Sequence, residues 1–191
     1  MKFKLVKTLR LLTFDLENRP LTYLGNDFTT SDITAIAWSW ADSDEVTCFL
    51  QTPRQNSQLR MLKEFVKVYN QADIVSGHYI RAHDLPHING ALLEYGLPLL
   101  GDKLTSDTKI DLVKRSGISA SQESLSGMYG LSQPKEHMSQ TEWRRANRLT
   151  PEGLEETRRR CVGDVVQSKA LRQRLIEAGA LGLPVMWSGK A

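Results

Sequence analysis

Cysteine is scarce in this chain. Its 191 residues include two cysteines, Cys48 and Cys161, and neither lies in a CxxC motif or a Cys/His cluster. This spacing argues against a disulfide framework and a zinc knuckle, and it is typical of a protein kept in a reducing cytoplasm, where we expect this one. A chain of this length buries roughly 70% of its unfolded surface, so its core needs no cross-links.

Long apolar runs are also missing. The N-terminal stretch is basic and then apolar, but Asp15 interrupts it too early for the hydrophobic segment of a signal peptide. No stretch approaches the roughly 18 apolar residues of a membrane helix, so we expect no membrane partner. The sequence also lacks a glycine-rich phosphate loop, a nucleophile elbow and a Rossmann fingerprint. Nucleotide-driven motors and acyl hydrolases are therefore excluded.

The net charge is only +3, but the positive charges are concentrated in one region. Residues 142–174 hold nine Lys or Arg and five acids, which leaves 16 basic and 17 acidic residues in the rest of the chain. A basic region of this kind attracts polyanions such as nucleic acids, although a solvated helix face has the same composition.

The first third of the chain has the pattern of β-strands. Apolar, β-branched and aromatic residues run or alternate in three segments, at 9–16, 33–40 and 45–50. A longer polar loop at 25–32 precedes the second segment, and a short turn at 41–44 precedes the third. These segments predict an antiparallel meander of three strands. Two further short strands are expected at 73–76 and 105–110.

The rest of the chain has helical periodicity. Spacing and caps predict four helices, at 57–69, 84–96, 123–129 and 150–178. Strands followed by interleaved helices and strands predict an α/β fold, with a mixed sheet flanked by helices. We expect a single domain over 1–178, with a polar irregular stretch at 132–149, and then a short, loose tail over 179–191.

Two carboxylates stand on the first predicted strand. Asp15 and Glu17 alternate with Phe14 and Leu16, so both acids share one face. On a buried strand such a pair is repulsive and costly to desolvate unless a cation neutralises it. The pattern therefore indicates a site for a hard divalent metal, with a solvated strand end as the alternative.

Two more acids lie further along the chain. Asp84 stands at a strand–loop–helix junction, where helix capping is the simplest interpretation. Asp164 borders the apolar side of its predicted helix, and Arg160 lies one turn earlier, where the two can form an ion pair. A zinc site is disfavoured because no Cys or helical acid completes a set of four ligands with the nearby histidines, His78, His83 and His87.

Taken in order, four segments resemble the motifs of the DEDD superfamily of 3′–5′ exonucleases. They are LTFDLEN at 12–18, GHYIRAHDLP at 77–86, TSDTKIDL at 105–112 and CVGDVVQSKAL at 161–171. The resemblance covers about residues 9–176, which is nearly the whole chain. It implies a ribonuclease H-like fold and hydrolysis of phosphodiester bonds at single-stranded 3′ ends.

The resemblance also implies catalytic roles for the four acids and for one arginine. Asp15, Glu17 and Asp164 would hold the Mg²⁺ or Mn²⁺ ion that activates water, and Asp15 and Asp84 would share a second ion. The superfamily has a Tyr or a His shortly before its last acid, where this chain has arginines. Arginine stays protonated, so Arg160 is expected to bind the scissile phosphate or to pair with an acid.

A single-stranded nucleic acid is the implied partner, DNA in preference to RNA. Trp143 is a candidate for stacking on bases. The implied contacts are His78, Tyr79, His83, Trp143, Arg144, Arg145 and Arg160. We expect a free-standing nuclease, or a proofreading or repair subunit beside a polymerase in a replication complex. An exoribonuclease of the same fold and a nucleic-acid-binding module that has lost catalysis are the alternatives.

Overall fold

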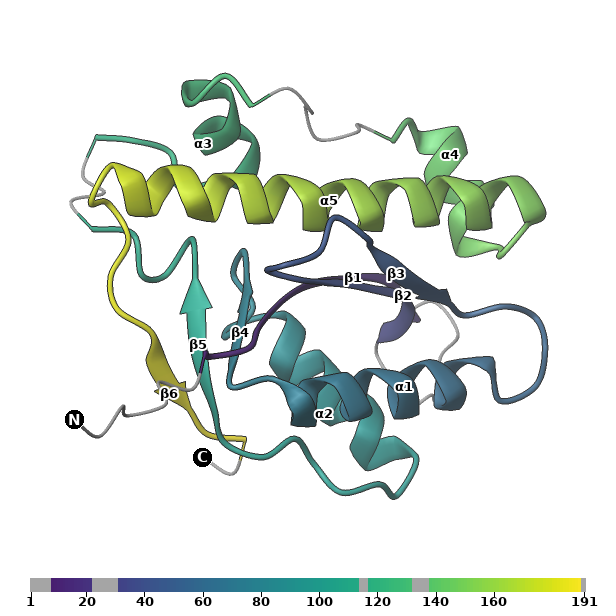
Figure 1. The fold of residues 1–191 in the computed structure, drawn as a ribbon. Coiled ribbons are helices and arrows are strands. Elements are labelled where there is room, and N and C mark those ends of the chain that lie inside the picture. The colour runs from purple at the N-terminus through teal and green to yellow at the C-terminus, as the bar shows by residue number, and fades with distance from the viewer. Residues whose placement is uncertain (1–7, 22–30, 114–116, 132–137, 190–191) are drawn as a thin grey trace.

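The structure is a computed structural model, and it describes residues 8–21, 31–113, 117–131 and 138–189. The strands form a mixed sheet in the order β3-β2-β1-β4-β5-β6 (Figure 1). Strands β1, β2 and β3 are antiparallel neighbours, β4 and β5 run parallel to β1, and β6 is antiparallel to β5. Their bounds are β1 Leu11–Pro20, β2 Ser31–Trp40, β3 Thr47–Leu50, β4 Ile74–Gly77, β5 Lys103–Asp107 and β6 Val185–Trp187.

Helices cover both faces of this sheet (Figure 1). The helices α1 and α2 lie on one face, whereas α5 crosses the other face with α3 and α4 beside it. Their bounds are α1 Ser57–Gln71, α2 Asp84–Glu94, α3 Gln122–Met128, α4 Gln140–Asn147 and α5 Pro151–Glu177. The predicted α/β class and the mixed sheet with a three-stranded meander are confirmed. None of the helices in the described ranges has the length and apolar content needed to cross a membrane.

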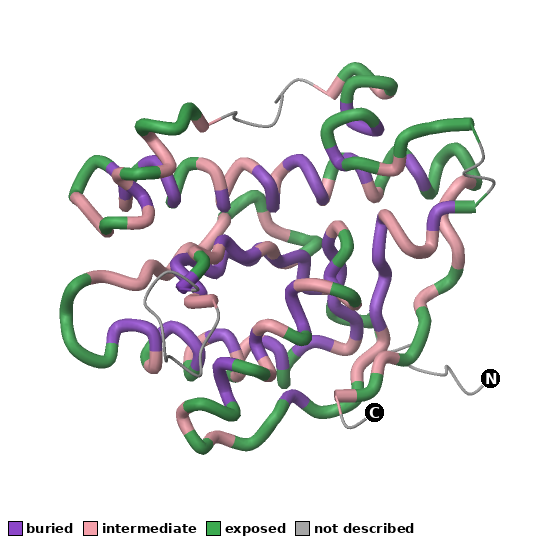
Figure 2. The backbone as a smooth tube through the Cα atoms, turned by 180° about the vertical axis from the view of Figure 1, so that it is seen from behind, coloured by how far each residue is buried: buried purple, intermediate pink, exposed green. Residues whose placement is uncertain are grey.

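The two faces of β1 differ sharply. Leu12, Phe14 and Leu16 are buried in the main core with apolar residues of α1 and α2. Asp15 and Glu17 therefore point to the opposite face, toward α5, because side chains alternate along a strand. Figure 2 shows the buried backbone following the central strands and the helix sides that face them.

Small side chains let α5 approach the sheet beside these acids. Ala35 and Ala37 of β2 stand opposite Glu17 and Asp15 in the β1–β2 register. Both alanines are fully buried under the α5 residues Cys161 and Val165. A close helix–sheet approach at this point brings the polar residues of α5 within reach of β1.

Two segments that were expected to be irregular or loose contain regular secondary structure. The stretch 132–149 contains α4, which begins with a capping box between Ser139 and Glu142, although 132–137 lie outside the described residues. The tail after residue 178 supplies β6, which pairs with β5 through Thr105 and Val185. The Thr105 hydroxyl also donates to the Val185 carbonyl oxygen at 2.8 Å, so this part of the tail is fixed on the sheet.

Candidate metal centre

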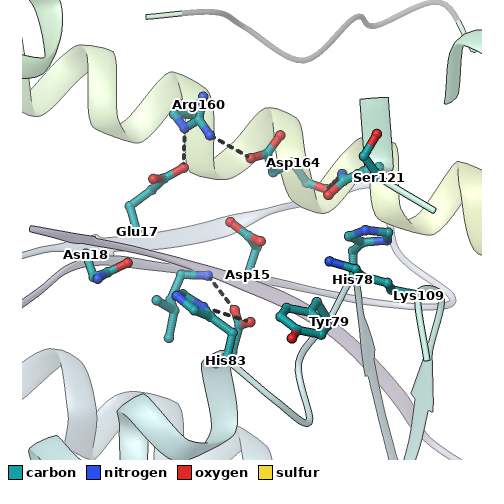
Figure 3. Close-up of a pocket in the computed structure, with 13 residues that line it drawn as sticks. Asp15, Glu17, Asn18, His78, Tyr79, His83, Lys109, Ser121, Arg160 and Asp164 are labelled. Atoms are coloured by element: carbon teal, nitrogen blue, oxygen red, sulfur yellow. Dashed lines mark hydrogen bonds and ion pairs between the residues drawn. The ribbon is translucent and has the colours of Figure 1, made fainter. Parts of the chain in front are cut away.

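Three carboxylates converge between β1 and α5 (Figure 3). Asp15, Glu17 and Asp164 each offer one carboxylate oxygen, and these oxygens lie within 4.8 Å of one another. Glu17 and Asp164 are buried, and Asp15 is partly buried. All three line one cavity of about 360 Å³. Like charges this close repel one another unless positive charge lies among them.

The placement of Asp164 follows from how α5 begins and packs. Thr150 caps the helix, because its hydroxyl oxygen accepts the Gly153 N–H at 3.1 Å. One turn before Asp164, the buried Cys161 thiol donates to the Asp15 carbonyl oxygen at 3.5 Å. This contact holds α5 over β1, so that Asp164 faces the two strand carboxylates.

Asp84 lines the same cavity but has different partners. It is the first residue of α2, and its Oδ1 accepts the Leu16 N–H at 3.2 Å. The pairing of β1 with β4 ends at Thr13. Three residues further along β1, the acceptor of the Leu16 backbone N–H is the Asp84 carboxylate. The carboxylate thus reaches across to β1. Among the described residues, the group of three converging carboxylates does not include Asp84.

His83 is the second partner of Asp84. Its Nδ1 lies 3.4 Å from Asp84 Oδ2. Burial raises the pKa of Asp84, and the hydrogen bond to Asp84 raises the pKa of His83. The ring of His83 also packs against that of His87, with the ring centres 4.3 Å apart and the planes tilted by 35°. The Nδ1 atom of His87 is bonded to the His83 carbonyl oxygen. In the described part of the chain, these histidines do not gather into a zinc-type ligand set.

Arg160 supplies positive charge at the edge of the cluster. Its Nε donates to Glu17 Oε1 at 2.6 Å, and its Nη2 lies 3.8 Å from Asp164 Oδ2. Only 13% of the side chain is exposed. Burial disfavours the charged guanidinium, but Glu17, Asp164 and Asp15 outweigh this and raise the pKa of Arg160. The predicted ion pair with Asp164 is confirmed, and Glu17 is a second, closer partner.

The opposite rim of the cavity is held by the buried carboxylate of Asp107. It accepts four backbone N–H groups at 3.0–3.1 Å, those of Tyr79, Arg81, Lys109 and Ile110. The network fixes Tyr79 in the left-handed region at φ 70°, with Lys109 Nζ 3.8 Å from its ring centre. His78 bonds through Nδ1 to the Thr108 hydroxyl at 2.9 Å. Side chains from the ends of two parallel strands therefore face the carboxylates.

Six of the seven residues predicted to contact nucleic acid fall into two groups, and Arg145 lines neither cavity. His78, Tyr79 and His83 line the carboxylate cavity together with Arg160. On α4, Trp143 and the exposed Arg144 line a separate groove of about 540 Å³. The two groups are in contact through Arg160, whose Cζ lies 5.1 Å from the Trp143 ring centre.

Several basic residues of 142–174 stabilise the fold through contacts with neighbouring elements. Arg145 pairs with Glu156 and so ties α4 to α5. Lys169 Nζ donates to the Ser39 hydroxyl and to two carbonyl oxygens of the same segment, and Arg172 Nε donates to Ser106. These cations fasten α5 to its neighbours, so the composition of 142–174 overstates the positive charge offered to a ligand.

Four polar residues that line the cavity were not among the predicted site residues. They are Asn18, Lys109, Ser121 and Gln122. Gln122 Nε2 donates to the Asp164 carbonyl oxygen at 3.1 Å and so supports the position of α5. The available signal was for Asn18 and Lys109, which each lie within one of the four motif-like segments.

No protein-family model matches the sequence, and no curated protein matches it. The fold is shared with solved structures. The structure of the family B DNA polymerase from the hyperthermophilic archaeon Pyrobaculum calidifontis matches 92% of this chain, with a TM-score of 0.64 and 15% sequence identity. The match covers 25% of the polymerase, so the chain spans about a quarter of that protein. At this identity the likeness shows a shared fold.

Proposed function

We propose that this chain is a metal-dependent 3′–5′ exonuclease, a single domain with a ribonuclease H-like fold. The proposal rests on the meeting of Asp15, Glu17 and Asp164 within 4.8 Å in one cavity. Asp84 lines the same cavity, so all four motif-like acids surround one space. The fold likeness to a DNA polymerase supports a nucleic-acid substrate and a proofreading or repair role beside a polymerase.

The donor set fits magnesium or manganese. Its atoms are carboxylate oxygens, which hard divalent cations prefer, whereas zinc usually recruits His or Cys. Asp15, Glu17 and Asp164 would hold one ion, and Asp15 and Asp84 would hold the second. When bound, such a pair supplies a hydroxide nucleophile and stabilises the leaving 3′ oxygen of an in-line displacement.

The remaining polar residues of the cavity orient the substrate. Arg160 and Lys109 are the cations placed to contact a phosphate oxygen there. Arg160 stays protonated and does not accept a proton from water, so its role is to bind a phosphate oxygen or to pair with an acid. Tyr79 and His83 present rings at the cavity, and Trp143 with Arg144 extends the path of a strand onto α4. We assign single-stranded DNA as the substrate, with RNA as the alternative.

One observation favours a second candidate, a nucleic-acid-binding module without catalysis. Arg160 already neutralises part of the carboxylate cluster through Glu17 and Asp164. A permanent ion pair there would replace the metal. The buried, closely spaced acids favour the nuclease, because without a cation they would repel both one another and the phosphates of a bound strand.

A labelled-oligonucleotide assay tests the proposal. Single-stranded DNA and RNA of one sequence, labelled at the 5′ end, are incubated with the protein in Mg²⁺, Mn²⁺ or chelator. We expect a ladder of products shortened stepwise from the 3′ end of DNA, present with metal and absent with chelator. A ladder on RNA alone would support the exoribonuclease, and binding without any ladder would support the binding module.

A further inference from the structure

The two cysteines, far apart in the sequence, lie together where α5 packs on the sheet. Cys161 of α5 and Cys48 of β3 belong to one small apolar cluster with Ala35 and Ala37 of β2. In the sheet register Cys48 stands opposite Ala37, and Ala37 stands opposite Asp15. Cys48 is partly buried, and Cys161 is fully buried. The fold therefore brings two free thiols together two strands away from the candidate metal ligands of β1.

Cys161 has a partner on each side. Toward β1, its thiol donates to the Asp15 carbonyl oxygen at 3.5 Å, and Asp15 Oδ2 lies 3.9 Å from the same sulfur. Toward β3, it forms a hydrogen bond with the Cys48 thiol that lowers the pKa of Cys48. The sulfur of Cys161 thus lies between a strand that carries two of the three converging carboxylates and a second thiol.

Cys48 has the surroundings of a reactive thiol. Besides the hydrogen bond with Cys161, the neighbouring Arg158 lowers the pKa of Cys48, while burial opposes both effects. Arg158 Nη1 also donates to the Cys48 carbonyl oxygen at 3.3 Å, which keeps this cation beside the thiol. Reactive cysteines are partly exposed and lie next to a positive charge, because the thiolate is the form that reacts. Cys48 meets both conditions, and Cys161 is placed as its resolving partner.

We propose that Cys48 and Cys161 form an intramolecular disulfide on reaction with a peroxide, and that this disulfide weakens cation binding at the neighbouring carboxylate cluster. The second part rests on the proposed function, because it requires the metal centre. The disulfide is reversible, as is usual for disulfides formed in a reducing compartment.

The reaction has two steps. The Cys48 sulfur attacks one peroxide oxygen, the O–O bond breaks, and the departing hydroxide takes up a proton to leave as water. Cys48 is then a sulfenic acid. The Cys161 sulfur attacks the Cys48 sulfur, the S–O bond breaks, and the departing hydroxide leaves as water with the Cys161 thiol proton. The two thiols are oxidised to one disulfide, and the peroxide is reduced to two waters.

The disulfide changes how α5 is held over the sheet. Oxidised Cys161 has no thiol hydrogen, so its hydrogen bond to the Asp15 carbonyl oxygen is lost. The new bond ties the same point of α5 to β3, which is separated from β1 by β2. Asp164 lies one turn further along α5 and moves with this point. The helix is thus drawn away from the strand that carries Asp15 and Glu17, and the three carboxylates converge less closely.

The first test is mass spectrometry. Wild-type protein is treated with hydrogen peroxide, unfolded in denaturant and alkylated with N-ethylmaleimide. We expect a monomer in which neither cysteine is alkylated, and a tryptic digest in which the peptides that contain Cys48 and Cys161 are joined. Dithiothreitol should restore both thiols. Unchanged thiols, a disulfide between two copies, or a sulfinic acid on Cys48 with Cys161 still alkylated would overturn the inference and leave the nuclease proposal standing.

The second test is the affinity for Mn²⁺, measured from the free Mn²⁺ signal in electron paramagnetic resonance. Oxidised wild type should bind Mn²⁺ about tenfold more weakly than reduced wild type, because groups that orient metal ligands contribute at least this factor. Dithiothreitol should restore the affinity. Equal affinities in the two forms would overturn the effect on the carboxylates.

Cys48→Ser is the matched control, because it keeps the size of the side chain and cannot form the disulfide. Its affinity for Mn²⁺ should be the same before and after peroxide. A tenfold loss in this variant would overturn the inference, since the oxidant would then act at another residue. Absence of Mn²⁺ binding in reduced wild type would overturn both the effect on the carboxylates and the metal centre of the proposed function.

Discussion

Arg160 donates from Nε to Glu17 Oε1 at 2.6 Å and so joins α5 to β1 across 143 residues of chain. Both side chains are nearly buried, and Asp164 adds a second acid to the same guanidinium. Removing one member of a buried ion pair usually costs more than the pair contributes, because the remaining charge loses its partner. The stability of this region therefore depends on whether a cation is present.

Arg160→Ala should lower the free energy of unfolding by about 3 kcal/mol in chelator, the cost typical of an orphaned buried charge. Mg²⁺ should restore most of this loss, because the ion neutralises the same acids. Urea unfolding with and without Mg²⁺ measures both values. Arg174→Ala, at a position of the same helix whose ion pair with Glu177 is solvent-exposed, should change stability by less than about 0.5 kcal/mol. A loss that Mg²⁺ does not reverse would contradict this account.

Asp15→Asn should reduce exonuclease turnover by about a hundredfold or more, because even residues that only support metal ligands cost up to that much. The same change should leave the melting temperature equal or raised in chelator, since it relieves repulsion within the cluster. Stepwise degradation of labelled DNA and thermal unfolding give the two readouts. Asp42→Asn, in an exposed turn, is the matched control. Full activity in Asp15→Asn would mean that the site lies elsewhere.

Local patterns predicted part of this site, and the meeting of Asp164 with Asp15 and Glu17 was implied by the resemblance to the DEDD motifs and by no local pattern. Alternation along β1 places Asp15 and Glu17 on one face, and helical spacing pairs Arg160 with Asp164. No local pattern shows that Glu17 is the closer partner of Arg160. Asp84 illustrates the same limit, because its position suggests a helix cap, whereas its carboxylate reaches the Leu16 N–H on another element.

The His83–Asp84 pair should make stability depend on pH. The hydrogen bond to Asp84 raises the pKa of His83 above its ordinary value of 6.5. The contribution of the pair is therefore fully present below about pH 6.5 and is lost as the pH rises through the raised pKa. In chelator, the melting temperature of wild type should fall more between about pH 6 and pH 8.5 than that of His83→Gln.

Nuclear magnetic resonance titration checks the cause of this effect. Asp84→Asn removes the carboxylate, so the pKa of His83 should move back toward its ordinary value. A wild-type His83 that titrates below 6.5 would contradict the pairing.

The contact of α4 with α5 depends on Gly153. A side chain there would collide with the backbone of Arg145 and Ala146, so Gly153→Ala should lower stability by about 1–3 kcal/mol and displace α4. Gly163, in the same helix, has no neighbouring atom within 4 Å of an added Cβ. Gly163→Ala should therefore raise stability by about 0.5–1 kcal/mol. Denaturant unfolding measures the stability of both variants. Equal changes in the free energy of unfolding would contradict the close approach of α4 to α5 at Gly153.

The irregular regions show why short elements escape sequence analysis. Helix α4 buries only Ala146, so it has no apolar stripe, although Ser139 and Glu142 form a capping box that was visible in the sequence. Strand β6 has three residues, too few for an alternating pattern, and it is stabilised by pairing with β5 far away in the chain. Both elements depend on tertiary contacts for their stability.

The most direct test of the account is the position of a bound ion. Crystals grown with Mn²⁺, and measured near the manganese absorption edge, should show an anomalous peak among the carboxylate oxygens of Asp15, Glu17 and Asp164. Crystals with Mn²⁺ bound elsewhere, or with no peak among these oxygens and Arg160 still bonded to Glu17, would contradict a metal centre here.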